Sequence, residues 1–193
     1  MKFPDPVIDI RDATSWVVDH IDEVNADADA KADIDNIFVM GHSAGAAIVA
    51  SLLLMPNVLS EEVKPRIRGA ILKGAVYHFN TKVVDLPPPV ISAYYGSPED
   101  TKQSVPLSLL NQASDEAVRS LPEIVLVVSE FEAYGVLESH GDFRRTLQER
   151  LGKDVLEVVM KGHTHITPHV SLYTGLGEEW AHELIAWMRA KIN

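Results

Sequence analysis

The chain has 193 residues, of which 46% are hydrophobic and 23% charged, as in an ordinary globular domain. Its net charge of −11 at pH 7 argues against nucleic acid or an anionic membrane as a partner, because no basic patch is there to neutralise phosphates. The absence of cysteine excludes disulfides and thiolate metal sites. We expect a single domain over residues 1–193 and, since no apolar run suits a signal peptide or a bilayer span, a cytoplasmic protein.

The hydrophobic pattern alternates between helical and extended periods, which is typical of an α/β fold with a parallel sheet flanked by helices. Apolar residues at three-to-four spacing predict helices, and short apolar runs predict buried strands. In chain order the predicted elements are a helix over 9–24, a strand over 37–40, a helix over 46–55, strands over 68–72 and 124–128, a helix over 139–151, a strand over 155–160 and a helix over 178–192. The proline-rich stretch between the second and third strands is typical of a cap made of short helices.

The first predicted strand meets the next helix at Gly41-His42-Ser43-Ala44-Gly45. In a Gly-X-Ser-X-Gly pattern, a sharp strand-to-helix turn exposes the serine hydroxyl at the edge of the sheet. The turn strains the serine backbone and crowds the positions two before and two after it, so we expect Gly41 and Gly45 both to be required. The helix N-terminus points at Ser43, and the Ala44 N–H is the natural oxyanion donor. We predict that Ser43 is a nucleophile.

A serine nucleophile of this kind needs a histidine base late in the chain. The segment after the fourth predicted strand holds His163, His165 and His169, and residues alone do not choose among them. The same three imidazoles also fit a zinc site, although no cysteine and no acidic residue within the cluster supports one. We therefore expect no metal and no cofactor. His78, which follows the second strand, is expected to line a pocket or loop rather than to act as the base.

The acid that orients the histidine should follow the third strand, where the chain carries Glu130 and Glu132. Either carboxylate could reach an imidazole nitrogen and orient the ring. The choice between the two stays open on chemistry alone.

Several segments together resemble the carboxylesterase, lipase and kynurenine-formamidase-like branch of the α/β-hydrolase superfamily. They are Gly41 to Ala46, Gly69 to Leu72 with Val76-Tyr77, Tyr94 to Asp100, Val127 to Ala133 and Gly162 to Ile166. The resemblance implies that His165, which precedes a large apolar residue, is the base. It also places Glu132 on the catalytic acid of the family. The implied activity is hydrolysis of a carboxylic ester or an aryl-formamide by a Ser43–His165–Glu132 triad through an acyl-enzyme.

The resemblance covers nearly the whole chain but only about the C-terminal two-thirds of the usual domain. The family's first strands and its His-Gly-Gly oxyanion loop have no counterpart in this sequence. We therefore expect an N-terminally shortened fold with an open sheet edge through which two copies of the chain could pair. The alternative function is that of a catalytically impaired fragment that acts only as a binding module.

Overall fold

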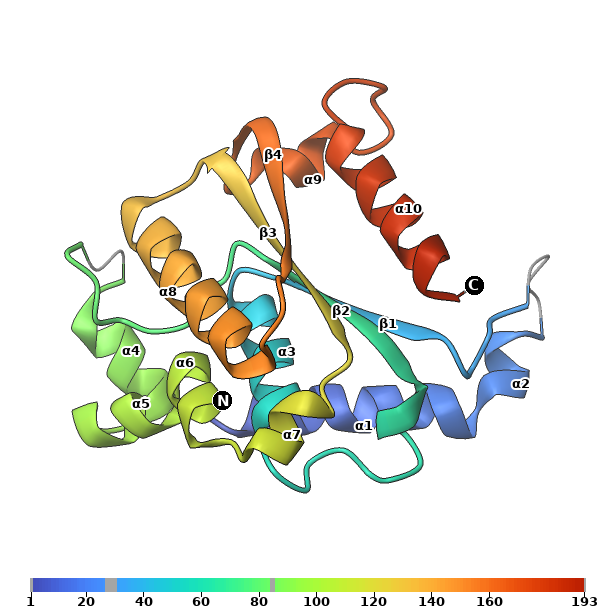
Figure 1. Ribbon diagram of the computed structural model, residues 1–193, viewed down its shortest axis with the longest axis horizontal. Coiled ribbons are helices and arrows are strands. Elements are labelled where there is room, and N and C mark those ends of the chain that lie inside the picture. The colour runs from blue at the N-terminus through green and yellow to red at the C-terminus, as the bar shows by residue number, and fades with distance from the viewer. Residues whose placement is uncertain (1, 27–30, 84–85, 193) are drawn as a thin grey trace.

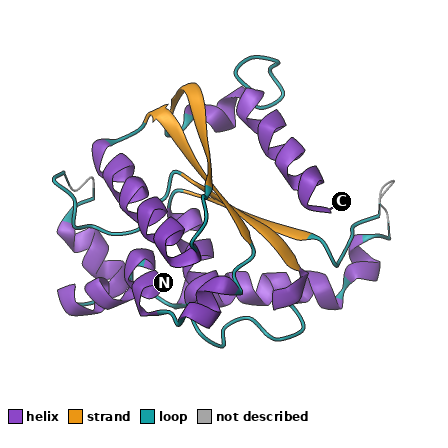
Figure 2. Cartoon of the chain, viewed as in Figure 1, coloured by secondary structure: helices purple, strands orange, loops and turns teal. Residues whose placement is uncertain are grey.

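The computed structural model describes residues 2–26, 31–83 and 86–192. Four parallel strands, β1 (Ile37–His42), β2 (Ile67–Lys73), β3 (Glu123–Phe131) and β4 (Leu156–Thr164), form one sheet in the order β1-β2-β3-β4 (Figure 1). Figure 2 shows this twisted sheet lying between layers of helices. The predicted α/β class and the four parallel strands are confirmed. All four strands run further toward their carboxyl ends than the apolar runs predict.

Helices cover both faces of the sheet (Figure 1). On one face α3 (Ala44–Leu54) and α8 (Tyr134–Leu151) pack on apolar side chains of β2 and β3, and α1 (Asp5–Asp19) packs outside α3. Small residues such as Ala46 and Ala50 on α3 allow it to approach the strands closely. On the other face α10 (Glu179–Ile192) buries Trp180 and Leu184 against a second apolar cluster. The sheet therefore has an apolar core on each of its faces.

The first helix differs from its prediction. It begins at Asp5 rather than Asp9, and it ends at Asp19, so that α2 (Ile21–Val24) follows as a separate turn. Proline at the first turn of α1 costs no hydrogen bond, because the first N–H groups of a helix have no partner within it. The interruption falls at His20, whose backbone leaves the helical region with φ −120° and ψ 31°.

The segment between β2 and β3 carries the short helices predicted for it. They are α4 (Pro88–Tyr95), α5 (Pro98–Ser104), α6 (Pro106–Gln112) and α7 (Asp115–Arg119). The first three begin at proline, whose fixed φ suits the first helical position. At α5 the Ser97 side chain and the Asp100 side chain each bond the other's backbone N–H, which completes a capping box. A last short helix, α9 (Thr167–Ser171), lies between β4 and α10.

Within the described residues β1 pairs with β2 alone, so its other edge carries no strand. Met40, in the middle of β1, has 58% of its surface exposed. Pairing of two copies at this edge stays a prediction. None of the described helices has the length and apolarity that crossing a bilayer would require.

Candidate active site

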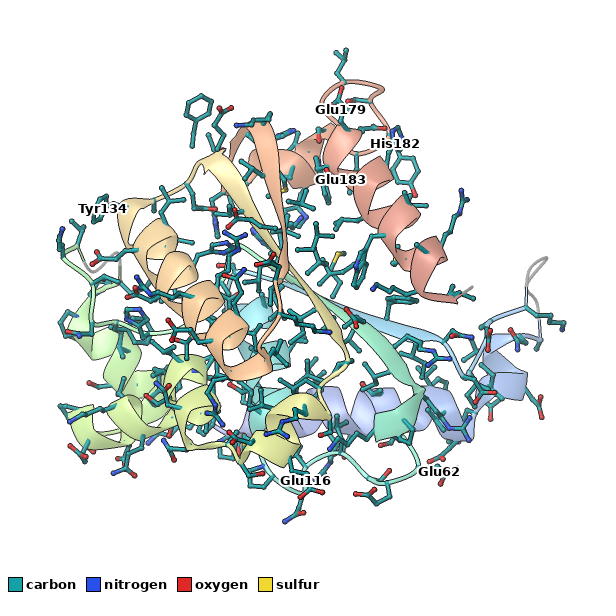
Figure 3. The ribbon with its side chains drawn as sticks, viewed as in Figure 1. Glu62, Glu116, Tyr134, Glu179, His182 and Glu183 are labelled. Carbon is teal, nitrogen blue, oxygen red and sulfur yellow. The ribbon has the colours of Figure 1, made fainter. Side chains whose placement is uncertain are left out.

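The predicted site residues all follow the carboxyl ends of strands. Ser43 comes directly after β1, Glu132 directly after β3, and His165 directly after β4. In a parallel sheet these ends share one edge, which is where sites of open α/β folds form. Figure 3 labels Tyr134 at this end of the molecule and Glu116 at the opposite end. The fold also brings the end of β1 to the loop after β4, because Nε2 of His42 lies 3.0 Å from the carbonyl oxygen of His165, 123 positions later.

Ser43 lies on a strained turn between β1 and α3. Its backbone has φ 56° and ψ −123°, a region that residues other than glycine rarely adopt. A Cβ at position 41 would lie 2.4 Å from the carbonyl oxygen of Gly45, so Gly41 is required. A Cβ at position 45 would meet nothing within 4 Å, and the expectation that Gly45 is required for space is therefore wrong. The Ser43 N–H donates to the carbonyl of Lys73 at 2.8 Å, which fixes the turn to β2.

Ala44 is the first residue of α3, and the first N–H groups of a helix lack partners within it. The Ser43 carbonyl accepts from the N–H groups of Ala46 and Ala47, at 3.1 and 3.2 Å, so the first turn is regular. The N–H of Gly74, on the neighbouring turn after β2, donates to the Val127 carbonyl at 2.8 Å. That N–H is thus already used and is not a second donor to an oxyanion.

His165 and Glu132 lie in contact. The Nδ1 atom of His165 is 2.9 Å from Oε1 of Glu132, and the two side chains are 28% and 1% exposed. The separation is that of a hydrogen bond, although the geometry at Nδ1 does not complete one. Catalytic hydrogen bonds in ligand-free sites are often poorly aligned in this way and tighten on substrate binding. With Nδ1 turned toward the carboxylate, Nε2 is the nitrogen left for a substrate or a nucleophile.

Gly74 supports this pair, which sequence reasoning did not foresee. It has φ +58°, and a Cβ on it would lie 3.2 Å from both Cε1 and Nδ1 of His165 and 3.3 Å from Oε2 of Glu132. The chain just beyond it is held by α8, because the backbone N–H groups of Tyr77 and His78 both donate to the Ser139 hydroxyl, at 2.7 and 3.0 Å. The imidazole and the carboxylate therefore pack against the backbone of Gly74, where a side chain would crowd both.

Glu130, the other candidate acid, has a different task. Its Oε2 accepts from the Gly162 N–H at 2.8 Å, and its Oε1 lies 3.5 Å from Nζ of Lys161. The Gly162 hydrogen bond, with Lys161 adding to it, lowers the pKa of the Glu130 carboxyl. The carboxylate thus joins the end of β3 to β4, and Glu132 is the one of the two that contacts His165.

Comparison with known proteins bears on this geometry. Residues 1–168 match the model of a protein family described by the alpha/beta hydrolase fold. The chain belongs to this family. No curated protein sequence matches it closely enough to show kinship.

Solved esterases share the fold of this α/β hydrolase. One from the fungus Rhizomucor miehei is 19% identical with a TM-score of 0.75, and the match covers 100% of this chain and 62% of that one. A bacterial heroin esterase is 23% identical with a TM-score of 0.71, covering 100% and 61%. A thermostable carboxylesterase from a metagenomic library is 20% identical with a TM-score of 0.71, covering 100% and 65%. The chain thus spans less than two thirds of the length of these relatives.

The remaining candidate histidine of β4 in this α/β hydrolase is structural. His163 is 7% exposed, its Nε2 donates to the Gly177 carbonyl at 2.7 Å, and its Nδ1 lies 3.1 Å from the Thr167 hydroxyl. Both ring nitrogens are therefore occupied in holding the loop between β4 and α10. His169 is exposed, and its ring lies 4.3 Å from that of His42. In the parts of the chain that the structure describes, no group of three or more His, Asp or Glu side chains is arranged to hold a metal.

His78 is buried, as a pocket residue after β2. Its Nε2 lies 3.1 Å from Oδ2 of Asp142, and its Nδ1 accepts from the Asn80 N–H at 3.2 Å. The pair lines an open groove of about 560 Å³ between α5, α6 and α8. This agrees with the expectation that His78 is a pocket or loop residue.

Lys73, at the end of β2, is a buried charge that the sequence pattern did not single out. It is 1% exposed, its amine has no hydrogen-bond partner, and it lies 4.5 Å from the ring centre of Trp180. Burial lowers the pKa of Lys73 to about 8. The backbone of this residue holds the Ser43 turn while its side chain lies under α10.

Proposed function

We propose that this chain carries the catalytic centre of a serine ester hydrolase, with Ser43 as nucleophile, His165 as base and Glu132 as the acid that orients the base. The observation that carries the proposal is the His165–Glu132 contact of 2.9 Å at the edge where the strained Ser43 turn lies. The family match supports it, and so do the structural relatives, which include a carboxylesterase and a heroin esterase.

The proposed reaction has two halves. Nε2 of His165 takes the proton of the Ser43 hydroxyl while Oγ attacks the carbonyl carbon of a carboxylic ester or an aryl-formamide. The Ala44 N–H and the positive end of α3 stabilise the negative charge that forms on the carbonyl oxygen. The protonated imidazole then gives its proton to the leaving alcohol or amine, which leaves an acyl group on Ser43. Water, deprotonated by the same imidazole, then attacks the acyl carbon, and the imidazolium returns its proton to Oγ as the bond to the acyl group breaks, which releases the acid and restores the serine.

Glu132 suits the role of orienting acid because its side chain is 1% exposed and can accept from Nδ1 of the imidazole. A buried carboxylate beside the ring holds one tautomer and stabilises the positive charge that appears on the ring when it takes a proton. Glutamate in place of aspartate is an accepted variant of this triad. No cofactor takes part in this chemistry.

The test is turnover of short p-nitrophenyl esters and of N-formylkynurenine by the wild type and by Ser43→Ala. We expect the substitution to lower kcat by a factor on the order of 10⁶, as in other serine hydrolases that lose the nucleophile. Ser92→Ala, on the exposed face of α4, is the matched control and should leave kcat unchanged. A Ser43→Ala variant that keeps more than a few per cent of wild-type turnover contradicts the assignment.

The alternative is a binding module without turnover. The Gly74 N–H is already bonded to Val127, so the proposed oxyanion site has one assigned donor, Ala44. Losing one of two such donors costs about 10² to 10³ in kcat, which would make turnover weak. A wild type that binds an ester analogue in calorimetry, yet hydrolyses none of the esters tested, would favour this alternative over the hydrolase.

A further inference from the structure

The side chain of His42 connects the nucleophile turn to the histidine loop. His42 is the last residue of β1 and directly precedes Ser43. Its Nε2 lies 3.0 Å from the backbone carbonyl oxygen of His165, a residue 123 positions later. Because a carbonyl oxygen can only accept, Nε2 carries the ring proton and donates it, and Nδ1 is left as an acceptor. The neighbour of the proposed nucleophile thus holds the backbone of the proposed base.

Packing keeps the His42 ring in this position. Its centre lies 4.5 Å from the ring of His165 and 4.3 Å from the ring of His169, which meets it edge to face at 67°. The ring therefore fills the space between the end of β1 and the chain that runs from β4 into α9. A shift of either segment would break the hydrogen bond or the ring contacts.

The surroundings also keep the ring neutral. Burial, together with the neighbouring His165, His169 and Lys73, lowers the pKa of His42 to about 4. These groups come from the loop after β4, from α9 and from β2, and together with burial they outweigh the hydrogen bond to the His165 carbonyl, which acts in the opposite direction on the pKa of His42. A neutral ring can donate to the carbonyl without placing a positive charge beside His165, which must itself accept a proton during the reaction.

We propose that His42 is a positioning residue for hydrolysis, whose hydrogen bond to the His165 carbonyl fixes the base relative to Ser43. This inference rests on the proposed function. The Ser43 N–H is bonded to the Lys73 carbonyl, and the His165 ring rests against Gly74 and Glu132. The first contact holds Ser43 to β2, and the second holds His165 to the turns after β2 and β3. The His42 hydrogen bond is the contact that joins the Ser43 turn directly to the His165 loop. A misplacement of about 1 Å in such a constellation can cost about 10²-fold in rate.

The test compares His42→Phe, which keeps a ring but loses the donor, with His42→Gln, whose amide N–H has a similar reach. We expect His42→Phe to lower kcat for a short p-nitrophenyl ester by about 10- to 100-fold with KM within about 2-fold of the wild type. His42→Gln should recover most of the lost kcat, which a merely space-filling role would not allow. Thermal unfolding shows whether each variant is folded, and His42→Leu replaces His42→Phe if the latter does not fold.

His20→Phe is the matched control. In the wild type, Nδ1 of His20 also donates to a backbone carbonyl, that of Trp16 at 2.9 Å, and the His20 ring also stacks on an aromatic ring. His20, however, lies at the end of α1. This variant should keep wild-type kcat. An active wild type whose kcat is unchanged in His42→Phe, or equally low in His42→Phe and His42→Gln, overturns the positioning role alone. A folded wild type that hydrolyses no ester overturns the proposed function and this role together.

Discussion

Replacing Lys73 by methionine should make the protein more stable at neutral pH, although it removes a charged group from the centre of the fold. The Lys73 side chain is 1% exposed and its amine has no hydrogen-bond partner. The Trp180 ring, 4.5 Å away, is the attractive contact that the ammonium makes there. Methionine has a similar length and carries no charge, so it fits the same space without the cost of desolvating an ammonium group.

The size of the effect follows from the pKa of Lys73, which burial lowers from 10.5 to about 8. Each unit of pKa is worth about 1.4 kcal/mol, so holding the proton in the folded state costs about 3 kcal/mol at pH 7. The loss of the Trp180 contact offsets this by about 1 kcal/mol. Since the pKa of the amine is lower in the folded state, this penalty is absent above the unfolded-state value of 10.5. It grows as the pH falls toward about 8 and is complete below that value.

The assay is urea unfolding of the wild type and Lys73→Met at pH 7 and at about pH 9.5. We expect the variant to be more stable by about 2 kcal/mol at pH 7, and the gap to change by about 2 kcal/mol in favour of the wild type at the higher pH. Lys102→Met, at an exposed position on α5, should show no such pH-dependent gap. A Lys73→Met variant that is less stable than the wild type at both values, or whose gap does not change with pH, would refute the reasoning.

Two matched pairs test the site. Gly41→Ala should abolish hydrolysis and lower the thermal midpoint, because its Cβ would lie 2.4 Å from the Gly45 carbonyl oxygen. Gly45→Ala, whose Cβ would meet nothing within 4 Å, should keep wild-type hydrolysis and the wild-type midpoint. Equal effects of the two substitutions would contradict the account of the turn. Glu132→Gln should lower kcat by about 10² or more, since the amide no longer stabilises the imidazolium. Glu130→Gln should instead leave kcat within about 3-fold, because its exposed carboxylate bonds the Gly162 N–H rather than His165.

The strands were predicted in number and in their parallel direction, but their ends were not. The apolar run of β1 stops at Met40, yet the strand continues through Gly41 and His42, which pair with Leu72 and Lys73 of β2. Glycine and histidine carry little preference for a strand, so the extension comes from pairing with a neighbour that lies far along the sequence. These extra residues decide where the site lies, because Ser43 begins where β1 ends.

The site was predicted in part for similar reasons. Ser43 has a local signature of glycine spacing between an apolar strand and a helix, which a sequence displays directly. The preference for His165 and Glu132 came from family resemblance, and the contact between them needed the fold. Gly74 and His42 had no local signal for their roles, because each acts through a partner that only tertiary structure brings near.

The central claim is that Ser43 is an activated nucleophile, and covalent capture tests it most directly. The folded wild type is treated with a fluorophosphonate probe, and the modified peptide is located by mass spectrometry. We predict a single adduct on Ser43 that is absent from heat-unfolded protein and strongly reduced in His165→Ala, since activation needs the folded site and its base. A folded wild type that shows no adduct at Ser43, or labels it equally after unfolding, would contradict the account.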